Sequence, residues 1–298
     1  MMPTLRRTHL QRAHLGRTLA ALFLTSLLYL SSGAQAAELK IATWNLNWLT
    51  TRSAGDPALP ADVTPRTQED FDRLAAYARE LDADVVALEE VDGFAAATRL
   101  FPHDAYSIHF THDHVIQRVA IAVRRTLHYE VNPDLRALSG NHLRSGADIT
   151  LHLPQGDLRI LAVHLKKGCR NMALQGARGR DCEELRDQIA PLTAWIAARA
   201  QENTPFLILG DFNRWMDGHD SFLAALDAPA PLLRATEGRA SPCWGGEAFI
   251  DHILAGGTAM RWIQPDSLRV LIYRETGHEW QDRLSDHCPV SVRLNVPE

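Results

Sequence analysis

Short apolar runs separated by turn residues fill the chain from residue 39 onward, and this pattern is typical of β-strands. Two of the runs, Val85 to Leu88 and Phe206 to Leu209, are apolar throughout, which predicts strands buried on both faces. The pattern predicts further strands over residues 39–48, 119–123, 149–153, 158–165, 248–254, 268–273 and 290–294.

Two segments carry apolar residues at helical spacing. The first ends near Leu81, and Thr64-Pro65 is suited to begin it because proline fits the first helical turn. The second begins near Asp181, where Glu184 completes a capping-box pattern, and Pro191 inside it predicts a kink or a break. Many strands with few long helices, and no repeat or linker, predict one α/β domain in which helices flank two packed sheets.

The first 36 residues have the composition of a signal peptide. Residues 1–18 carry four arginines and no acid, residues 19–30 are largely apolar, and Ala34-Gln35-Ala36 matches a cleavage site. The apolar stretch is shorter than the roughly 20 residues of a membrane-spanning helix, so we expect export without a stable membrane anchor. This division predicts a signal peptide over residues 1–36 and a monomeric domain over residues 37–298, located in the periplasm or outside the cell.

The net charge excludes a general affinity for polyanions. The formal charge of the full chain is −5, and loss of the leader, with its four arginines and no acid, makes it −9. An acidic protein does not attract nucleic acid or anionic membranes through its overall field. Any polyanionic substrate must therefore be held by a local basic patch or by a metal ion.

Polar residues interrupt or end several of the apolar runs. Polar groups at the ends of core strands cost free energy unless they are paired or used, so they are candidates for a functional site. The Asp286-His287 pair before the last strand is the most informative of them, because an imidazole beside a carboxylate can be held rigidly and still face a cleft. Together they indicate a metal-assisted hydrolase, and the set comprises Asn45, Asn47, Glu89, Glu90, His164, Asp211, Asn213, Asp251, Asp286 and His287.

A metal site is expected where the first two strands end. Asn45 and Asn47 stand two positions apart on a strand, so we expect both side chains on one face. Glu90 ends the neighbouring run and would bring a carboxylate to the same edge. Carboxylate and amide oxygens are the ligands that suit Mg²⁺. A turn explains Asn45 alone, and a surface charge explains Glu90 alone, so the prediction depends on their combination.

An acid-base pair is expected near the C-terminus. Asp251 would orient His287 by accepting one ring N–H, which leaves the other ring nitrogen to take a proton from water. Asp286 would then face the metal or position the nucleophile.

His164 ends another apolar run and is followed by Lys166 and Lys167, cations that suit phosphate binding. Taken alone, His164 is more simply a hydrogen-bonded core residue. Asp211 and Asn213 are, taken alone, more simply a helix cap or an Asx turn.

Four cysteines in an exported chain allow two disulfides in three pairings. Cys169–Cys182 would close a short surface loop, and Cys243–Cys288 would then tie two late segments near Asp286; free buried thiols are the alternative. Between the first two cysteines lies the densest basic cluster of the chain. It is either a solvated loop or a disulfide-pinned loop that binds substrate phosphates through Lys166, Arg178 and Arg180.

Six motifs in order, TWNLNWL, VVALEEVD, VHLK, ILGDFN, FIDHIL and SDHCPV, resemble the endonuclease/exonuclease/phosphatase superfamily over residues 39–295. This resemblance implies a four-layer αββα sandwich of two mainly antiparallel sheets, with the site between the sheet edges. It also implies a metal-dependent phosphoric ester hydrolase that uses Mg²⁺, with Mn²⁺ or Ca²⁺ as alternatives. The matched positions imply metal-side roles for Asn45 and Glu90 with Asn47 beside them, and catalytic roles for His164, Asp211, Asn213, Asp251 and His287.

Two positions depart from the family pattern. Glu89 stands where many members have Gln, which adds a charge beside the metal site. Asn47 occupies a position that is Asp in abasic-site enzymes, which argues against DNA repair, as export does.

The expected activity is that of an exported nuclease or related phosphodiesterase acting on DNA or RNA. The alternatives are a secreted sphingomyelinase-like lipid hydrolase and a small-molecule phosphoesterase. A non-catalytic binding module is disfavoured, because the histidines and aspartates of the site are all present.

Overall fold

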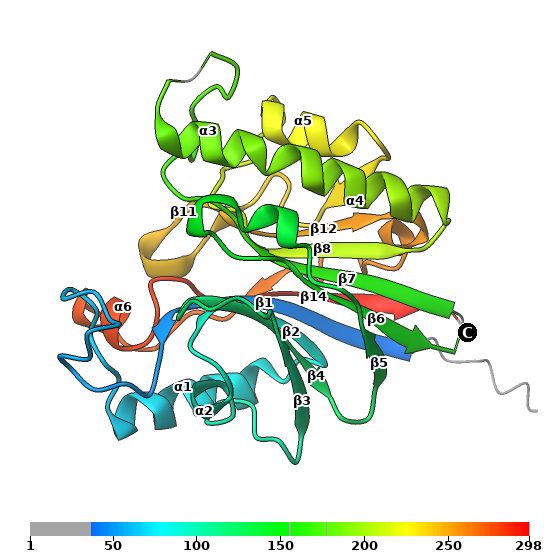
Figure 1. Cartoon of the computed structure of the whole chain (residues 1–298). Coiled ribbons are helices and arrows are strands. Elements are labelled where there is room, and N and C mark those ends of the chain that lie inside the picture. Colours follow the sequence, from blue (N-terminus) through cyan, green and yellow to red (C-terminus); the bar gives the residue numbers. More distant parts are fainter. Residues whose placement is uncertain (1–36, 155, 177, 298) are drawn as a thin grey trace, which may run out of the picture. The chain divides into compact units, whose positions relative to one another are not determined.

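The computed structural model describes residues 37–297 except 155 and 177 (Figure 1). The predicted signal peptide, residues 1–36, lies outside the described residues. Within the described part of the chain, no helix is long and apolar enough to cross a membrane.

Two six-stranded sheets lie face to face. The first has the strand order β13-β14-β1-β2-β4-β3 and the second β5-β6-β7-β8-β12-β9. The pairs β1–β2 and β7–β8 are parallel and the others are antiparallel, so the sheets are mainly antiparallel, as predicted. The strands of the first sheet are β1 (Ala37–Leu49), β2 (Val85–Val91), β3 (Tyr106–Phe110), β4 (Arg118–Arg124), β13 (Arg269–Val270) and β14 (Val290–Val296). Those of the second are β5 (His128–Val131), β6 (Ala147–Leu153), β7 (Gly156–His164), β8 (Phe206–Asp211), β9 (Leu232–Arg234) and β12 (Asp251–Gly256).

Helices cover the outer faces of both sheets, which completes the predicted αββα sandwich (Figure 1). On the first sheet lie α1 (Gln68–Leu81) and α2 (Phe94–Ala97), and on the second lie α3 (Arg180–Asp187), α4 (Ile189–Gln201) and α5 (Ser221–Asp227). The remaining short elements are β10 (Ala240–Ser241), β11 (Glu247–Ala248), α6 (Glu279–Arg283), η1 (Arg136–Leu138), η2 (Gly140–His142), η3 (Cys243–Gly245) and η4 (Gly257–Arg261).

The alternation of side chains along each strand divides the core into three apolar layers. In β1, Ala42, Trp44 and Leu46 face α1, while Leu39 and Ile41 face the second sheet. The inter-sheet layer is therefore built from alternate residues of every long strand. Residues that extend the same inward-facing series past the apolar core must therefore also lie between the two sheets.

Several element boundaries differ from the prediction. Helix α1 begins three residues after Pro65, because Thr67 and Asp70 form a capping box there. Helix α3 is preceded by Gly179 without a side-chain cap, so Asp181 lies in its first turn and pairs with Lys166 instead. The helix breaks at Gln188, as Pro191 predicted, and this proline lies in the first turn of α4, where a missing N–H costs little.

Four strands, β3, β5, β9 and β10, lie outside the predicted runs, and two predicted strands are shorter or broken. The run over residues 248–254 divides between β11 and β12, and the run over residues 268–273 contributes only β13. The missed strands are short or lie at the edges of the sheets, where one side of the backbone needs no partner strand and the side chains are mixed.

We predict that the buried carboxylate of Asp148 is essential for attaching α4 to the second sheet. It accepts two hydrogen bonds from Arg159, at 2.9 and 2.7 Å, and one from Trp195 Nε1 at 2.7 Å. Asp148→Ala leaves both donors unpaired, so it is expected to lower the free energy of unfolding by about 3–5 kcal/mol in urea titrations. Asp157→Ala, which removes an exposed partner of His152 on the same sheet, should cost less than about 1 kcal/mol. Equal losses in the two variants would contradict this assignment.

Candidate active site

Polar side chains continue the inward-facing rows of both sheets beyond the apolar inter-sheet layer. In β8, for example, Leu209 belongs to that layer and Asp211 follows two positions later. The same step of two leads from an apolar residue to a polar one in four other strands. The polar residues placed between the sheets in this way are Thr43 and Asn45, Glu89, His164, Asp211 and Asp251.

Irregular backbone brings further residues to this edge. Glu90 and Asn47 have φ values of 60° and 43°, in the left-handed region that non-glycine residues seldom adopt. The pairing of β1 with β2 and of β2 with β4 shifts register at the same place. This bulge turns Glu90 inward beside Glu89. It also removes Asn47 from the row of Asn45, so the expectation that both side chains share a face is wrong.

Asn45 connects the two sheets at the centre of the site. Its Nδ2 donates to Asp211 Oδ2 at 3.0 Å and to Glu90 Oε1 at 3.3 Å. Its Oδ1 accepts the backbone N–H of Asn47 at 2.9 Å, while the Asn47 side chain donates to the carbonyl of Gln281 in α6. The predicted metal-side pair Asn45 and Glu90 is therefore in contact, whereas Asn47 supports the loop.

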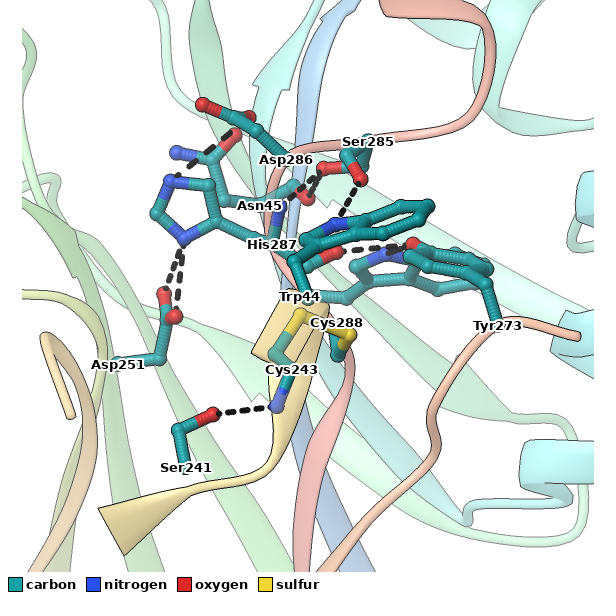
Figure 2. The surroundings of a disulfide bond; sticks show 11 residues. Trp44, Asn45, Ser241, Cys243, Asp251, Tyr273, Ser285, Asp286, His287 and Cys288 are labelled. Carbon is teal, nitrogen blue, oxygen red and sulfur yellow. Dashed lines mark hydrogen bonds and ion pairs between the residues drawn. A yellow bond between two sulfur atoms is a disulfide. The ribbon is translucent and has the colours of Figure 1, made fainter. Parts of the chain in front are cut away.

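His287 and Asp251 form the predicted pair (Figure 2). His287 Nδ1 lies 2.9 Å from Asp251 Oδ2, and Nε2 faces Asp211 Oδ2 at 3.8 Å and Asp286 Oδ1 at 3.9 Å. Burial opposes protonation of His287, but the charges of Asp251 and Asp211 raise its pKa well above the usual value. The ring is thus held at one nitrogen and presents the other to the cleft.

Asp211 is the carboxylate that the other groups surround. Asn213, with a φ of 52°, donates its backbone N–H to Asp211 Oδ1 at 2.7 Å and its side-chain amide to Oδ2 at 3.0 Å. The same amide also donates to the Leu165 carbonyl, so Asn213 acts here by fixing Asp211. Burial raises the pKa of Asp211 to about 7, against the opposing charge of His287.

His164 is buried between the sheets, with Nε2 at 3.5 Å from Asp211 Oδ2 and 3.6 Å from Glu90 Oε1. Burial, reinforced by the charge of Arg144, lowers the pKa of His164 well below the usual value, so the ring is neutral at neutral pH. A neutral imidazole facing carboxylates can donate one N–H, and that donor is suited to a substrate phosphate oxygen.

Glu89, which is expected to add a charge beside the metal site, lies in surroundings that disfavour its charged form. It is fully buried and accepts a hydrogen bond from Thr43 Oγ1 at 3.0 Å. Burial, with the nearby charges of Asp251 and Asp211, raises the pKa of Glu89 well above the usual value. A protonated Glu89 is compatible with the glutamine that many family members carry at this position.

Four residues of the site were missed from the sequence. Gln117 donates to Glu90 Oε2 and accepts from Arg144 at 2.7 Å, and both residues lie outside the apolar runs on which the prediction relied. Ser285 donates to the Asn45 carbonyl at 2.7 Å and accepts the backbone N–H of His287 at 3.0 Å. Tyr273 donates to the His287 carbonyl at 2.9 Å (Figure 2). The place of Ser285 directly before Asp286 could have identified it.

The basic loop is pinned by the Cys169–Cys182 disulfide, as predicted. Its cations are only partly available. Lys166 Nζ lies 2.8 Å from Asp181, and Arg180 Nε lies 2.7 Å from Glu184. Arg178 and Lys167 are exposed.

The second disulfide, Cys243–Cys288, ties the η3 segment to the residue that follows His287 (Figure 2). Beside it opens a pocket of about 330 Å³ whose wall includes Asp251, His287, Trp244 and Arg170. Trp244 stacks on Tyr273 and donates its Nε1 to the Ser285 carbonyl at 3.0 Å. The pocket therefore joins the predicted acid-base pair to the basic loop.

The sequence profile described as the Endonuclease/Exonuclease/phosphatase family matches residues 42–287. The chain belongs to this family. Its members are metal-dependent phosphoester hydrolases, and they use divalent ions. A search of curated proteins finds no match.

Solved structures show the same fold at low sequence identity. TDP2 from D. rerio, in complex with a single-strand DNA product, is 16% identical with a TM-score of 0.60, over 87% of this chain and 100% of that one. The 3′ phosphatase NExo from Neisseria, bound to a product DNA hairpin, is 17% identical with a TM-score of 0.55, over 86% and 99% of the chains. The human nocturnin catalytic domain, with a bound sulfate, is 15% identical with a TM-score of 0.54, over 86% and 93%.

The residues present fit a divalent cation. Asp211, Asp251 and His287 offer ligand atoms within 4.8 Å of one another, and Glu90 adds carboxylate oxygens next to the Asn45 amide that contacts Asp211. Burial is the main cause of the raised pKa of Asp211, and the charges of Asp251 and Glu90 act in the same direction. A bound cation would offset the repulsion among these carboxylates.

We predict that His287→Ala lowers kcat by roughly 10²–10⁴-fold, since a positioned acid-base group contributes about that much. Steady-state hydrolysis of a chromogenic phosphodiester measures the effect. Asp251→Asn should give a smaller loss because the ring remains but its partner is weakened. His219→Ala, which changes an exposed histidine of the segment before α5, is the matched control and should retain full activity. Wild-type turnover in the purified His287→Ala protein would refute the assignment.

A second prediction concerns pH and metal. A carboxyl whose folded pKa is raised contributes stability at low pH and loses it as pH rises, for Asp211 between about 4 and about 7. Above this window the ionised cluster favours a cation, so Mg²⁺ should raise Tm at pH 8 and have little effect at pH 5, as measured by calorimetry with Mg²⁺ or chelator. Glu90→Gln should abolish the difference. A Mg²⁺ effect that is the same at both pH values, or unchanged in Glu90→Gln, would contradict this interpretation.

Proposed function

We propose that this protein is an exported, Mg²⁺-dependent phosphodiester hydrolase that acts on nucleic acid. The observation that carries the proposal is the Asp251-bound His287, whose Nε2 faces Asp211, which in turn contacts Asn45 beside Glu90. This arrangement holds a proton acceptor, a carboxylate and oxygen ligands around one space, which phosphodiester hydrolysis requires.

In this mechanism His287 takes the proton from the attacking water. A cation bound among the carboxylates would offset the negative charge that raises the pKa of His287, which would leave Nε2 free to accept that proton. The hydrogen bond from Nδ1 to Asp251 fixes the ring and stabilises the imidazolium that forms. Asp211, which Asn213 holds from two directions, orients the same water. The neutral His164 donates a hydrogen bond to a non-bridging oxygen and so stabilises the charge that develops on the phosphorus group.

Glu90 would hold the Mg²⁺ ion, and Asn45 would join it once its amide is turned so that Oδ1 faces the ion. The half-exposed Asp286, whose Oδ1 lies 3.9 Å from His287 Nε2, would contribute from the rim. When bound, the ion supplies Lewis-acid stabilisation of the phosphate charge. Oxygen-only ligands favour Mg²⁺, and Mn²⁺ or Ca²⁺ suit the same donors.

Nucleic acid is the substrate that the observations favour. The TDP2 and NExo structures with the same fold contain DNA products. The exposed cations Lys167, Arg170 and Arg178 lie on the segment that follows His164, and Arg170 lines the pocket beside His287. Arg180 and Lys166 contribute less than the sequence suggested, because each pairs closely with an acidic side chain of α3. Arg170 makes only a longer ion pair, at 3.6 Å, with the exposed Glu247.

A lipid substrate is less well supported. Among the described residues, the exposed large apolar side chains Phe94, Val131, Met172 and Ile272 are scattered over separate elements. A hydrolase that works on membranes would be expected to gather such side chains into one patch.

The experiment compares plasmid DNA, RNA, sphingomyelin vesicles and a chromogenic phosphodiester, each with Mg²⁺ and with chelator. Cleavage of DNA or RNA that needs Mg²⁺ is expected, and cleavage of sphingomyelin alone would overturn the nucleic-acid assignment. Fractionation of cells that express the full chain or a chain without residues 1–36 tests export, which requires the leader.

The double variant Arg170→Ala, Arg178→Ala should raise KM for DNA about tenfold and reduce the salt dependence of binding, because each lost phosphate contact lowers the slope by about 0.9. Its kcat on the small chromogenic phosphodiester should be unchanged. Arg261→Ala, at the end of η4 remote from Asp251, is the control and should leave the slope as it is. An unchanged slope in the double variant would show that this loop does not bind the polyanion.

A further inference from the structure

A second group of imidazole and carboxylate side chains lies at one edge of the sandwich, away from the catalytic residues. Strand β3 is the last strand of the first sheet, and β5 is the last strand of the second. The two edges meet there, since Ser107 Oγ of β3 lies 2.9 Å from Tyr129 OH of β5. His109 is two residues further along β3, and Asp134 is the third residue after the end of β5.

His109 and Asp134 are buried and face each other without a proper hydrogen bond. Their side chains are 8% and 3% exposed, and His109 Nε2 lies 3.4 Å from Asp134 Oδ1. Within the described part of the chain, neither of these two atoms has a hydrogen-bond partner, and the buried Thr111 Oγ1 has none either. Leaving such atoms unpaired costs about 1–3 kcal/mol each, so this arrangement calls for a ligand.

The spacing suits two ligands of one metal ion. At bond lengths of about 2.0–2.1 Å, two atoms on a tetrahedral ion lie about 3.3–3.4 Å apart. A nitrogen and an oxygen at 3.4 Å meet this requirement, whereas a hydrogen bond between them would be shorter and better aligned.

His112 supplies a third donor. Its Nδ1 lies 2.8 Å from Asp134 Oδ2, and its backbone N–H donates to the same oxygen at 2.8 Å. The ring is 80% exposed, and its centroid lies 6.1 Å from that of His109, so a turn of this exposed side chain brings it to the shared space. Burial opposes ionisation of Asp134, but the contacts with His109 and His112 lower its pKa.

We propose that His109, His112 and Asp134 form a binding site for a zinc-like divalent ion, distinct from the catalytic site. Two imidazoles and one carboxylate favour Zn²⁺ over Mg²⁺, which prefers oxygen ligands. The ion would join the edge of the first sheet to that of the second.

The site would also anchor the β3–β4 loop. Asp113 of this loop accepts the backbone N–H and the hydroxyl of Ser145, each at 2.8 Å. Gln117, at the far end of the loop, contacts Glu90. An ion at His112 would therefore stabilise the segment that carries a contact to the predicted Mg²⁺ ligand.

The test uses the full chain in a His287→Ala background, which weakens competing zinc binding at the catalytic site. After chelator treatment and dialysis, the protein is titrated with Zn²⁺ by calorimetry, and with Co²⁺ to record the visible absorption that reports tetrahedral coordination. Binding of one Zn²⁺ that His112→Ala weakens at least tenfold is expected. Zn²⁺ should also raise Tm of the parent protein more than that of His112→Ala.

His128→Ala is the matched control, because it removes an exposed histidine from the neighbouring strand β5. It should bind Zn²⁺ like the parent. Asp134→Asn should abolish binding, and if that variant does not fold, the exposed His112→Ala decides the question. Zinc binding that is absent in the parent, or equal in the parent and His112→Ala, would overturn the proposal.

Discussion

The hydrogen bond between Asp251 and His287 is the interaction on which the site depends. Asp251 begins β12 of the second sheet, and His287 lies in the loop that leads into β14 of the first. The bond therefore connects the two sheets at the edge where the apolar core between them ends. Asn45 makes a second crossing, from β1 to Asp211 of β8. The two crossings hold several carboxylates closer together than their mutual repulsion alone would allow.

Strain at the same edge serves this arrangement. Left-handed backbone at Asn47, Glu90 and Asn213 costs free energy at each position, and all three lie around the same space. In return, the bulge in β2 turns two successive glutamates toward the same space between the sheets. In a regular strand their side chains would point to opposite faces. The buried apolar layers on both sides of each sheet supply the stability that tolerates this cost.

Much of the fold and the site could be predicted from the sequence because both follow from alternation. A row such as Leu207, Leu209 and Asp211 already shows that an inward-facing series ends in a carboxylate. What could not be predicted depends on departures from alternation. Asn47 leaves its row at a bulge, Lys166 and Arg180 are paired with acids brought by α3, and Gln117 reaches Glu90 from a loop. Such contacts depend on tertiary packing, which does not appear in the periodic pattern of apolar and polar residues along the chain.

The Cys243–Cys288 disulfide links the geometry of this cleft to the chemistry of its surroundings. Cys288 follows His287 directly, and its bond to Cys243 is a covalent restraint on the loop that carries the ring. In a reducing cytoplasm the loop would lack this restraint, and the ring would be held by hydrogen bonds alone. If the chain is exported as proposed, the disulfide forms only outside the cytoplasm, as the last step of maturation. A nucleic-acid hydrolase would then reach its working geometry only after it has left the compartment that holds the genome of the cell that made it.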